Sequence, residues 1–136
     1  MTADLPPTGW PTPVIDLGTP TSVHIVGVGG AGMSAIATVL VAMGHSVTGS
    51  DLKESRVTAR LSAADIPVTI GHDAGNLPAG VAAVAISTAI PAHNPEVQEA
   101  VRRNIPVLRR ADILAAIAAE RRTIAVAGTH GKTTTS

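Results

Sequence analysis

The stretch Val23-His24-Ile25-Val26-Gly27-Val28-Gly29-Gly30-Ala31-Gly32 decides the fold of this 136-residue chain. A short strand is predicted at its start, and beyond its glycines apolar residues recur at helical spacing from Met33 to Met43. Between the two, the chain must turn sharply, approach an anion through its backbone and pack a helix against the strand. Glycines 27, 29 and 32 respectively meet these demands. The predicted helix would offer free N–H groups and a partial positive charge to a diphosphate.

The alternation of strands and helices continues to residue 120. Strands are predicted at 46–50, 67–70, 81–86 and 107–108, and helices at 55–64, 95–103 and 111–120. Ser55 and Asn94 are expected to cap helices, and Gly44 to end the first one. Strands separated by helices of about ten residues favour parallel pairing through right-handed crossovers. We therefore predict an α/β protein with a Rossmann-like open parallel sheet of about five strands and helices on both faces.

Two segments flank this predicted domain, which we place at 21–120. Residues 1–20 are rich in proline and are predicted to form a flexible lead-in. Residues 123–127 are predicted to form a sixth strand, followed by the loop Gly128-Thr129-His130-Gly131-Lys132-Thr133-Thr134. A strand and a Gly-Lys-Thr loop begin a nucleoside triphosphate site. We therefore expect 121–136 to be the first strand and phosphate loop of a second, ATP-binding domain, and the chain to be the amino-terminal part of a larger enzyme.

Composition excludes several classes of protein. Ten basic and ten acidic residues give zero formal charge, and Trp10 is the single aromatic residue, so neither a basic face nor stacking rings are available for nucleic acid. Cysteine is absent, which removes disulfides and thiolate chemistry. No run approaches about 18 apolar residues and the start lacks a signal-peptide pattern, so we expect a soluble, cytoplasmic protein. His24, His45 and His93 lack metal-site spacing, so no zinc site is expected.

Polar residues at the ends of the predicted strands are candidate ligand contacts. Asp51 ends the second strand, where a carboxylate either binds a ribose diol or caps the following turn. Ser87 and Thr88 end the central strand, where open α/β sheets place ligands, although their hydroxyls can also cap a turn. His72 lies in a polar loop and is either a surface residue or a nucleotide contact. Because NAD and a UDP-sugar both carry a ribose and a diphosphate, these residues alone leave three classes open: an oxidoreductase domain, a nucleotide-sensing module and a sugar-nucleotide enzyme.

Several motifs resemble those of the Mur ligase family, beginning with the stretch from Val23 to Ala37. The other motifs follow in the family's order and are Gly49-Ser50-Asp51, Gly71-His72, Ser87-Thr88-Ala89-Ile90, Asn94-Pro95-Glu96, Arg109-Arg110-Ala111-Asp112 and Gly128–Thr134. The turn Gly29-Gly30-Ala31-Gly32-Met33 is similar to that of the member that adds L-alanine, rather than the member that adds a tripeptide. In the phosphate loop Val126 departs from the general pattern and Gly128 stands in for the expected glycine, as in this family.

The resemblance implies an ATP-dependent carboxylate–amine ligase of peptidoglycan precursor synthesis. In such an enzyme the lactyl carboxylate of UDP-N-acetylmuramate attacks the γ-phosphate of ATP, and the amine of L-alanine captures the resulting acyl phosphate. The implied contacts for the UDP-substrate are Gly27, Gly29, Gly30, Ala31, Gly32, Met33, Ser50, Asp51, His72, Ser87, Thr88, Ala89 and Ile90. Of these, Gly29 to Met33 would hold the diphosphate and Asp51 the ribose.

The implied contacts for ATP are Gly128, Thr129, His130, Gly131, Lys132, Thr133 and Thr134. By the same resemblance Lys132 and Thr133 are the catalytic residues, with Lys132 neutralising charge on the transferred phosphoryl group and Thr133 holding Mg²⁺. We expect this chain by itself to bind the UDP-substrate without catalysing the reaction. An NAD-binding oxidoreductase domain is the alternative, and it leaves the Gly-Lys-Thr loop unexplained.

Overall fold

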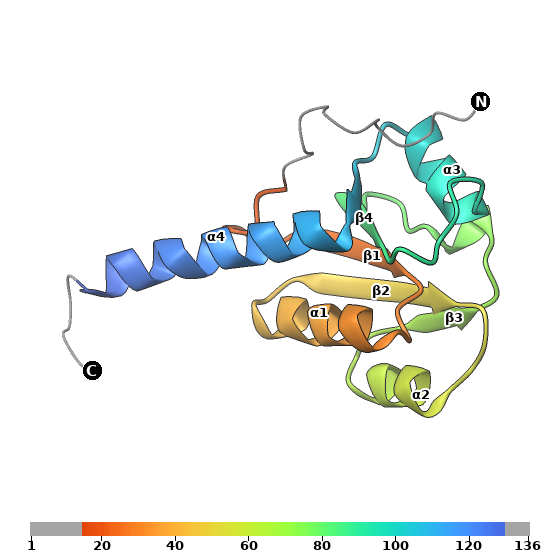
Figure 1. Cartoon of the computed structure of the whole chain (residues 1–136), viewed down its shortest axis with the longest axis horizontal. Helices are drawn as coiled ribbons and strands as arrows, with labels where there is room; N and C mark the ends of the chain where they lie inside the picture. Colours follow the sequence, from red (N-terminus) through yellow and green to blue (C-terminus); the bar gives the residue numbers. More distant parts are fainter. Residues whose placement is uncertain (1–14, 130–136) are drawn as a thin grey trace.

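Five parallel strands form one sheet in the computed structural model, which describes the backbone of residues 15–129 and the side chains of residues 15–122 (Figure 1). The strands are β1 (Ser22–Val26), β2 (Ser46–Asp51), β3 (Val68–Ile70), β4 (Ala83–Ile86) and β5 (Val107–Arg109). They lie in the order β3-β2-β1-β4-β5, and every neighbouring pair is parallel. The predicted α/β fold with a Rossmann-like parallel sheet is confirmed.

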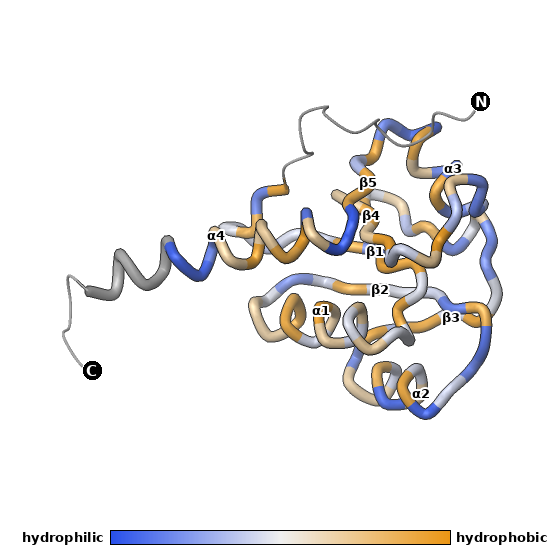
Figure 2. The backbone as a smooth tube through the Cα atoms, viewed as in Figure 1, coloured by the Kyte–Doolittle hydropathy of each residue, from blue (hydrophilic) through white to orange (hydrophobic). Residues whose placement is uncertain are grey.

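Helices cover both faces of this sheet, as predicted. They are α1 (Ala31–Ala42), α2 (Arg56–Ala63), α3 (Pro95–Arg102), α4 (Arg110–Thr129) and the short 3₁₀ helix η1 (Ala74–Asn76). Successive residues of a strand point to opposite faces, so Ile25 packs in a cluster with α1, α2 and α4, whereas Val26 packs in a cluster with α3. Figure 2 shows apolar residues along the central strands and hydrophilic residues in the loop between β2 and α2. None of the helices within residues 15–129 is long and apolar enough to cross a membrane.

Local sequence signals explain where several helices begin and end. The Ser55 hydroxyl accepts a hydrogen bond from the Thr58 N–H at 3.2 Å, and the Thr58 hydroxyl accepts one from the Ser55 N–H at 2.8 Å, which completes a capping box for α2. The Asn94 side chain caps α3 through the Glu96 N–H at 2.8 Å. Gly44 follows α1 with φ +97°, a left-handed conformation that glycine adopts without strain. All three predicted helix boundaries are confirmed.

Helix α4 contradicts the strand predicted at 123–127, because it continues without interruption from Arg110 to Thr129. The backbone groups of a strand need a partner strand, whereas those of a helix are satisfied within the segment itself. Among residues 15–129 the five strands pair only with one another. The alanine-rich run that enters 123–127 favours helix, so helix is the conformation this segment takes.

The predicted lead-in also differs from the structure. Ile15 and Leu17 pack against the core cluster that includes α1 and α4, and Leu17 is buried. Burial of Leu17 and partial burial of Ile15 hold the segment on the domain, so the folded part begins before residue 20. Trp10 and the other residues of 1–14 lie outside the described part of the chain.

Candidate functional site

A cleft opens at the carboxyl ends of the strands, where the sheet order changes direction. From β1 the chain crosses to β2 on one side, while β4 pairs with β1 on the other side. Loops after β1 and β4 therefore diverge, and open α/β sheets bind ligands in the crevice between such loops. The cleft has a volume of about 600 Å³. It is lined by Gly27, Gly30, Asp51, Leu52, His72, Ser87, Ala89, Ile90, Pro91, His93, Asn94 and Pro95.

Gly27 lets these two loops meet at the floor of the cleft, from which they diverge. Its φ is +82°, and a Cβ at this position would lie 3.2 Å from Ile90 Cδ1 and 3.3 Å from Ser87 Oγ. The N–H groups of Gly27 and Val28 both donate to the Ser50 carbonyl oxygen, at 2.8 and 3.0 Å. The turn after β1 is thus tied to β2 and closed against the loop after β4, which gives the cleft a fixed floor.

The Asp51 side chain, at the end of β2, also holds the turn after β1, and this contact explains why residue 29 is a glycine. The Gly29 N–H donates to Asp51 Oδ2 at 2.7 Å, and the Leu52 N–H donates to Asp51 Oδ1 at 2.7 Å. A Cβ at 29 would lie 2.6 Å from Asp51 Oδ2 and 3.1 Å from Thr58 Cγ2. Gly29 is therefore required by the packing of the turn on Asp51 and α2, rather than by the approach of an anion. Gly30, which lines the cleft, has nothing nearer to its missing Cβ than the Gly27 carbonyl oxygen at 3.6 Å.

The start of α1 is open, unlike the starts of α2 and α3. Its N-cap is Gly30, no side chain among the described residues caps it, and its first turn holds no acidic residue. The first intrahelical bond runs from the Ser34 N–H to the Gly30 carbonyl at 2.8 Å, so the N–H groups of Ala31, Gly32 and Met33 have no acceptor within the helix. Three free donors and the positive end of the helix dipole favour an anion at this point.

Arg110 brings a cation to the same place. A Cβ on Gly32 would lie 2.8 Å from the Arg110 Nε and 3.0 Å from its Cζ, so the guanidinium lies directly over the first turn of α1. Arg110 is exposed and has no ion pair with any residue in 15–122. Its charge is therefore free to attract the same anion as the N–H groups of α1.

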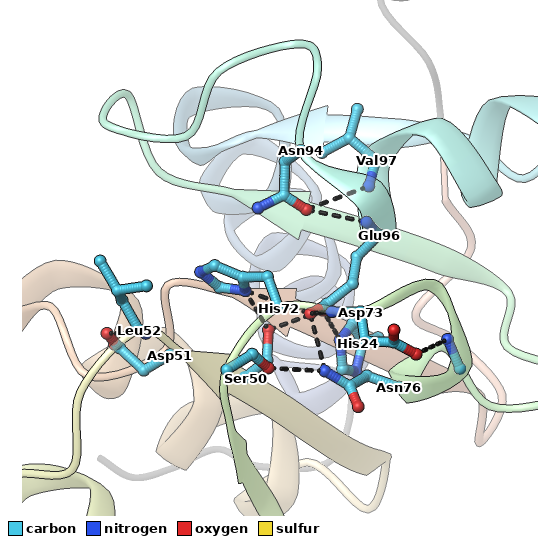
Figure 3. A network of polar contacts seen from close by, with 12 residues as sticks. His24, Ser50, Asp51, Leu52, His72, Asp73, Asn76, Asn94, Glu96 and Val97 are labelled. Atoms are coloured by element: carbon cyan, nitrogen blue, oxygen red, sulfur yellow. Dashed lines mark hydrogen bonds and ion pairs between the residues drawn. The ribbon is translucent and has the colours of Figure 1, made fainter.

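Behind the cleft, the buried carboxylate of Glu96 collects five hydrogen-bond donors (Figure 3). Its Oε1 accepts from Ser50 Oγ and from His24 Nε2, both at 2.6 Å. Its Oε2 accepts from Asn76 Nδ2 at 2.9 Å, from His72 Nδ1 at 3.1 Å and from the Asp73 N–H at 3.2 Å. The Glu96 side chain has no exposed surface, so it touches no ligand itself.

This arrangement keeps Glu96 ionised. Burial alone would raise the pKa of its carboxyl group, but the hydrogen bonds from His24, Ser50 and Asn76 and the nearby His24 ring outweigh burial and lower the pKa to about 2. The Thr48 hydroxyl lies 2.7 Å from His24 Nδ1, so a neutral His24 can donate to Glu96 through Nε2 and accept from Thr48 through Nδ1. Among residues 15–122, no group of three or more His, Asp or Glu side chains is arranged to hold a metal ion.

Comparison with known proteins decides the family. Residues 22–122 match the family described as "Mur ligase family, catalytic domain". The chain belongs to the Mur ligase family. It is 63% identical over 114 residues to the UDP-N-acetylmuramate–L-alanine ligase of Rubrobacter xylanophilus, a match that covers 84% of this chain and 25% of that protein. It is 55% identical over 115 residues to the ligase of the same name from Acidiphilium cryptum, a match that covers 85% of this chain and 24% of that protein.

A solved structure agrees with this assignment. The UDP-N-acetylmuramate–alanine ligase of Thermotoga maritima superposes with a TM-score of 0.64 at 34% identity, covering 66% of this chain and 21% of that one. The chain spans about a quarter of the length of the curated Mur ligases that it matches. The similarity therefore concerns one part of a Mur ligase, and this part contains the cleft.

The structure brings together some of the predicted contacts of this Mur ligase and separates others. Residues at the cleft that were predicted as contacts are Gly27, Gly30, Asp51, His72, Ser87, Ala89 and Ile90. Ser50 and Met33 are buried instead, because Ser50 turns its hydroxyl toward Glu96 and Met33 packs in the core. Met33 therefore offers a ligand only its backbone N–H. Thr88 is exposed and does not line the cleft. Of the predicted ATP contacts, Gly128 and Thr129 end α4, and His130 to Thr134 lie outside the described residues.

Three features of the site were missed at the level of sequence. Arg110 was quoted only within a family motif, with no role toward an anion, and the Glu96 cluster was not foreseen. A signal for the cluster was present, since His24 interrupts an otherwise apolar strand and Glu96 sits in the first turn of a capped helix. Gly49 was quoted as a family motif only, whereas a Cβ there would lie 2.7 Å from Val28 Cβ, so this glycine allows the turn to pack on β2.

Proposed function

We propose that this chain binds the UDP end of UDP-N-acetylmuramate and is part of an ATP-dependent ligase that adds L-alanine to that substrate. The observation that carries the proposal is the uncapped start of α1 beside the cleft. A diphosphate fits three N–H groups that have no acceptor in the helix and an arginine that has no ion pair among residues 15–122. The identity of 63% to a ligase named for these substrates supports the choice among nucleotide diphosphates.

The diphosphate would lie on the N–H groups of Ala31 to Met33, with Gly30 leaving room and Arg110 balancing charge. The ribose would lie near Asp51. Although the two oxygens of this carboxylate already accept from Gly29 and Leu52, each has a second lone pair that can accept from a hydroxyl group. The uridine or sugar would lie against His72, Ser87 and Ile90, where apolar side chains line much of the cleft.

The chemical step would take place with the help of the ATP loop. Lys132 would neutralise charge on the transferred phosphoryl group, and Thr133 would be a ligand of the Mg²⁺ that accompanies ATP. The folded residues from 15 to 120 would belong to the UDP-substrate-binding domain, and the phosphate loop at 128–134 to the ATP-binding domain. Binding of the remote UDP group would position the lactyl carboxylate and lower the entropic barrier to its reaction. Because both proposed nucleotides are cytoplasmic, we propose a cytoplasmic location.

Calorimetry with UDP-N-acetylmuramate, UDP, NAD and ATP tests this proposal. We expect the 136-residue chain to bind UDP-N-acetylmuramate and UDP, and not NAD. Binding of NAD alone would instead favour the oxidoreductase alternative. In a protein that contains the whole family length, continued turnover of ATP to ADP should require both UDP-N-acetylmuramate and L-alanine, and Lys132→Ala should abolish it while leaving UDP affinity unchanged.

A further inference from the structure

The Glu96 cluster has one member that reaches the cleft. Of the four side chains that bond to Glu96, those of His24, Ser50 and Asn76 do not line the cleft, whereas His72 does. The His72 side chain is 15% exposed. In Figure 3 its Nδ1 faces the carboxylate, and its other ring nitrogen points away from the cluster. Of these side chains, His72 is therefore the one that can transmit the Glu96 hydrogen bond directly to a ligand in the cleft.

The positions of the hydrogens follow from the acceptors. An ionised Glu96 has no hydrogen to give, so each of its five neighbours must donate. The Ser50 hydroxyl hydrogen is used at Glu96 Oε1, at 2.6 Å. His72 Nδ1 lies 3.1 Å from Glu96 Oε2 and 3.2 Å from Ser50 Oγ, and both oxygens present lone pairs to it. The proton of a neutral His72 must therefore be on Nδ1, which leaves Nε2 as a bare acceptor.

We propose that Glu96 is a positioning residue that holds His72 in the Nδ1–H tautomer, so that Nε2 accepts a hydrogen bond from an N–H or O–H group of the bound nucleotide. This inference rests on the proposed function for the identity of the ligand. On uridine 5′-diphosphate three donors are available: the uracil N3–H and the 2′ and 3′ hydroxyls of the ribose. A site that presents a buried acceptor discriminates against analogues without the matching donor.

The tautomer is measured without any ligand. In ¹⁵N-detected NMR of the 136-residue chain, the two His72 ring nitrogens should give well-separated signals of a single tautomer, with Nε2 unprotonated. His93 lines the same cleft but is exposed and has no bond to Glu96, so it is an internal reference that should show a mixture of tautomers. Glu96→Gln should move His72 toward such a mixture, because the amide replaces one acceptor by a donor. An Nε2–H tautomer of His72 in the unaltered chain would overturn the inference.

Ligand affinity is measured by calorimetry with UDP and with three analogues that lack, one at a time, the N3–H, the 2′-hydroxyl and the 3′-hydroxyl. His72→Asn keeps an N–H donor toward Glu96 and removes Nε2. We expect it to weaken UDP binding about five- to tenfold, the ratio expected for one net hydrogen bond. One analogue should bind both proteins equally, because the group that His72 accepts from is missing. That analogue identifies the donor as base or ribose.

The outcomes separate the two proposals. UDP binding that is unaffected by His72→Asn would overturn this inference and leave the proposed function intact. Failure of UDP to bind the unaltered chain would contradict the proposed function, and with it the ligand part of this inference. His72→Asn leaves Glu96 and its other donors in place. It therefore still tests whether His72 accepts a hydrogen bond from the ligand, even in the case that Glu96→Gln does not fold.

Discussion

Replacing Gly29 by alanine should destabilise the fold, whereas the same change at the adjacent Gly30 should not. A Cβ at 29 would lie 2.6 Å from Asp51 Oδ2 and 3.1 Å from Thr58 Cγ2, so the carboxylate must move. Moving it breaks the Gly29 N–H bond to a charged acceptor, worth about 1.5–3 kcal/mol. Overpacking of this kind costs about 1–3 kcal/mol. Because the two effects overlap, we expect a total loss of about 2–4 kcal/mol.

The matched control is Gly30→Ala. Gly30 has φ −67° and ψ 150°, which any residue adopts, and nothing lies within 3.6 Å of its missing Cβ. We expect it to change stability by less than about 1 kcal/mol, because no contact is lost. In thermal unfolding a difference of 2 kcal/mol corresponds to roughly 7–10 °C for a domain of this size.

A double-mutant cycle identifies the cause. If the contact with Asp51 is responsible, Gly29→Ala should cost much less in an Asp51→Ala background, because the oxygen that blocks the methyl group is gone. Equal melting temperatures for the two alanine variants would refute this account of the turn. A loss of stability from Gly29→Ala that is equally large with Asp51 and in the Asp51→Ala background would also refute it.

Three further predictions follow from the site and its supports. The pKa of Glu96 is lowered from 4.5 to about 2, so its ionised form stabilises the fold above pH ~4.5, and this contribution of about 3 kcal/mol should be lost as the pH falls toward 2. In urea unfolding, the difference in free energy of unfolding between the unaltered chain and Glu96→Gln should shrink over that pH range. A difference that stays constant with pH would contradict this prediction. Ser55→Ala removes the capping box of α2 and should cost about 1 kcal/mol, whereas Ser62→Ala on the exposed part of α2 should cost little. Arg110→Gln should weaken UDP binding about five- to tenfold at low salt and less at high salt. Arg109→Gln is its control, and calorimetry that finds equal losses for both would exclude a specific contact for Arg110.

Much of the fold could be predicted because its signals are local. Apolar spacing, the caps Ser55 and Asn94 and the glycine turn lie within a few residues of the elements that they determine. The segment 123–127 was predicted wrongly for the same reason. An apolar run suits either a strand or a helix, and the choice depends on whether a partner strand is present. The local sequence pattern carries no information on this.

The site was less predictable because side-chain direction depends on packing. The predicted strand ends placed Asp51 and Ser87 at one edge of the sheet, as observed, but they did not reveal that Ser50 turns inward. The Glu96 cluster unites residues from β1, β2, η1 and α3, which are brought together by strand order and register. A pattern along the chain carries no information on such long-range contacts.

The five donors on Glu96 also bear on how the cleft responds to a ligand. Glu96 belongs to α3, and the start of α3 forms one wall of the cleft through Asn94 and Pro95. If α3 moved away alone, one charge and five polar groups would lose their partners together, so this wall cannot act as an independent lid. The wall is as stable as the domain that carries it. Under the proposed function, a nucleotide would then fill a surface that already exists, and little of its binding free energy would be spent on ordering the protein.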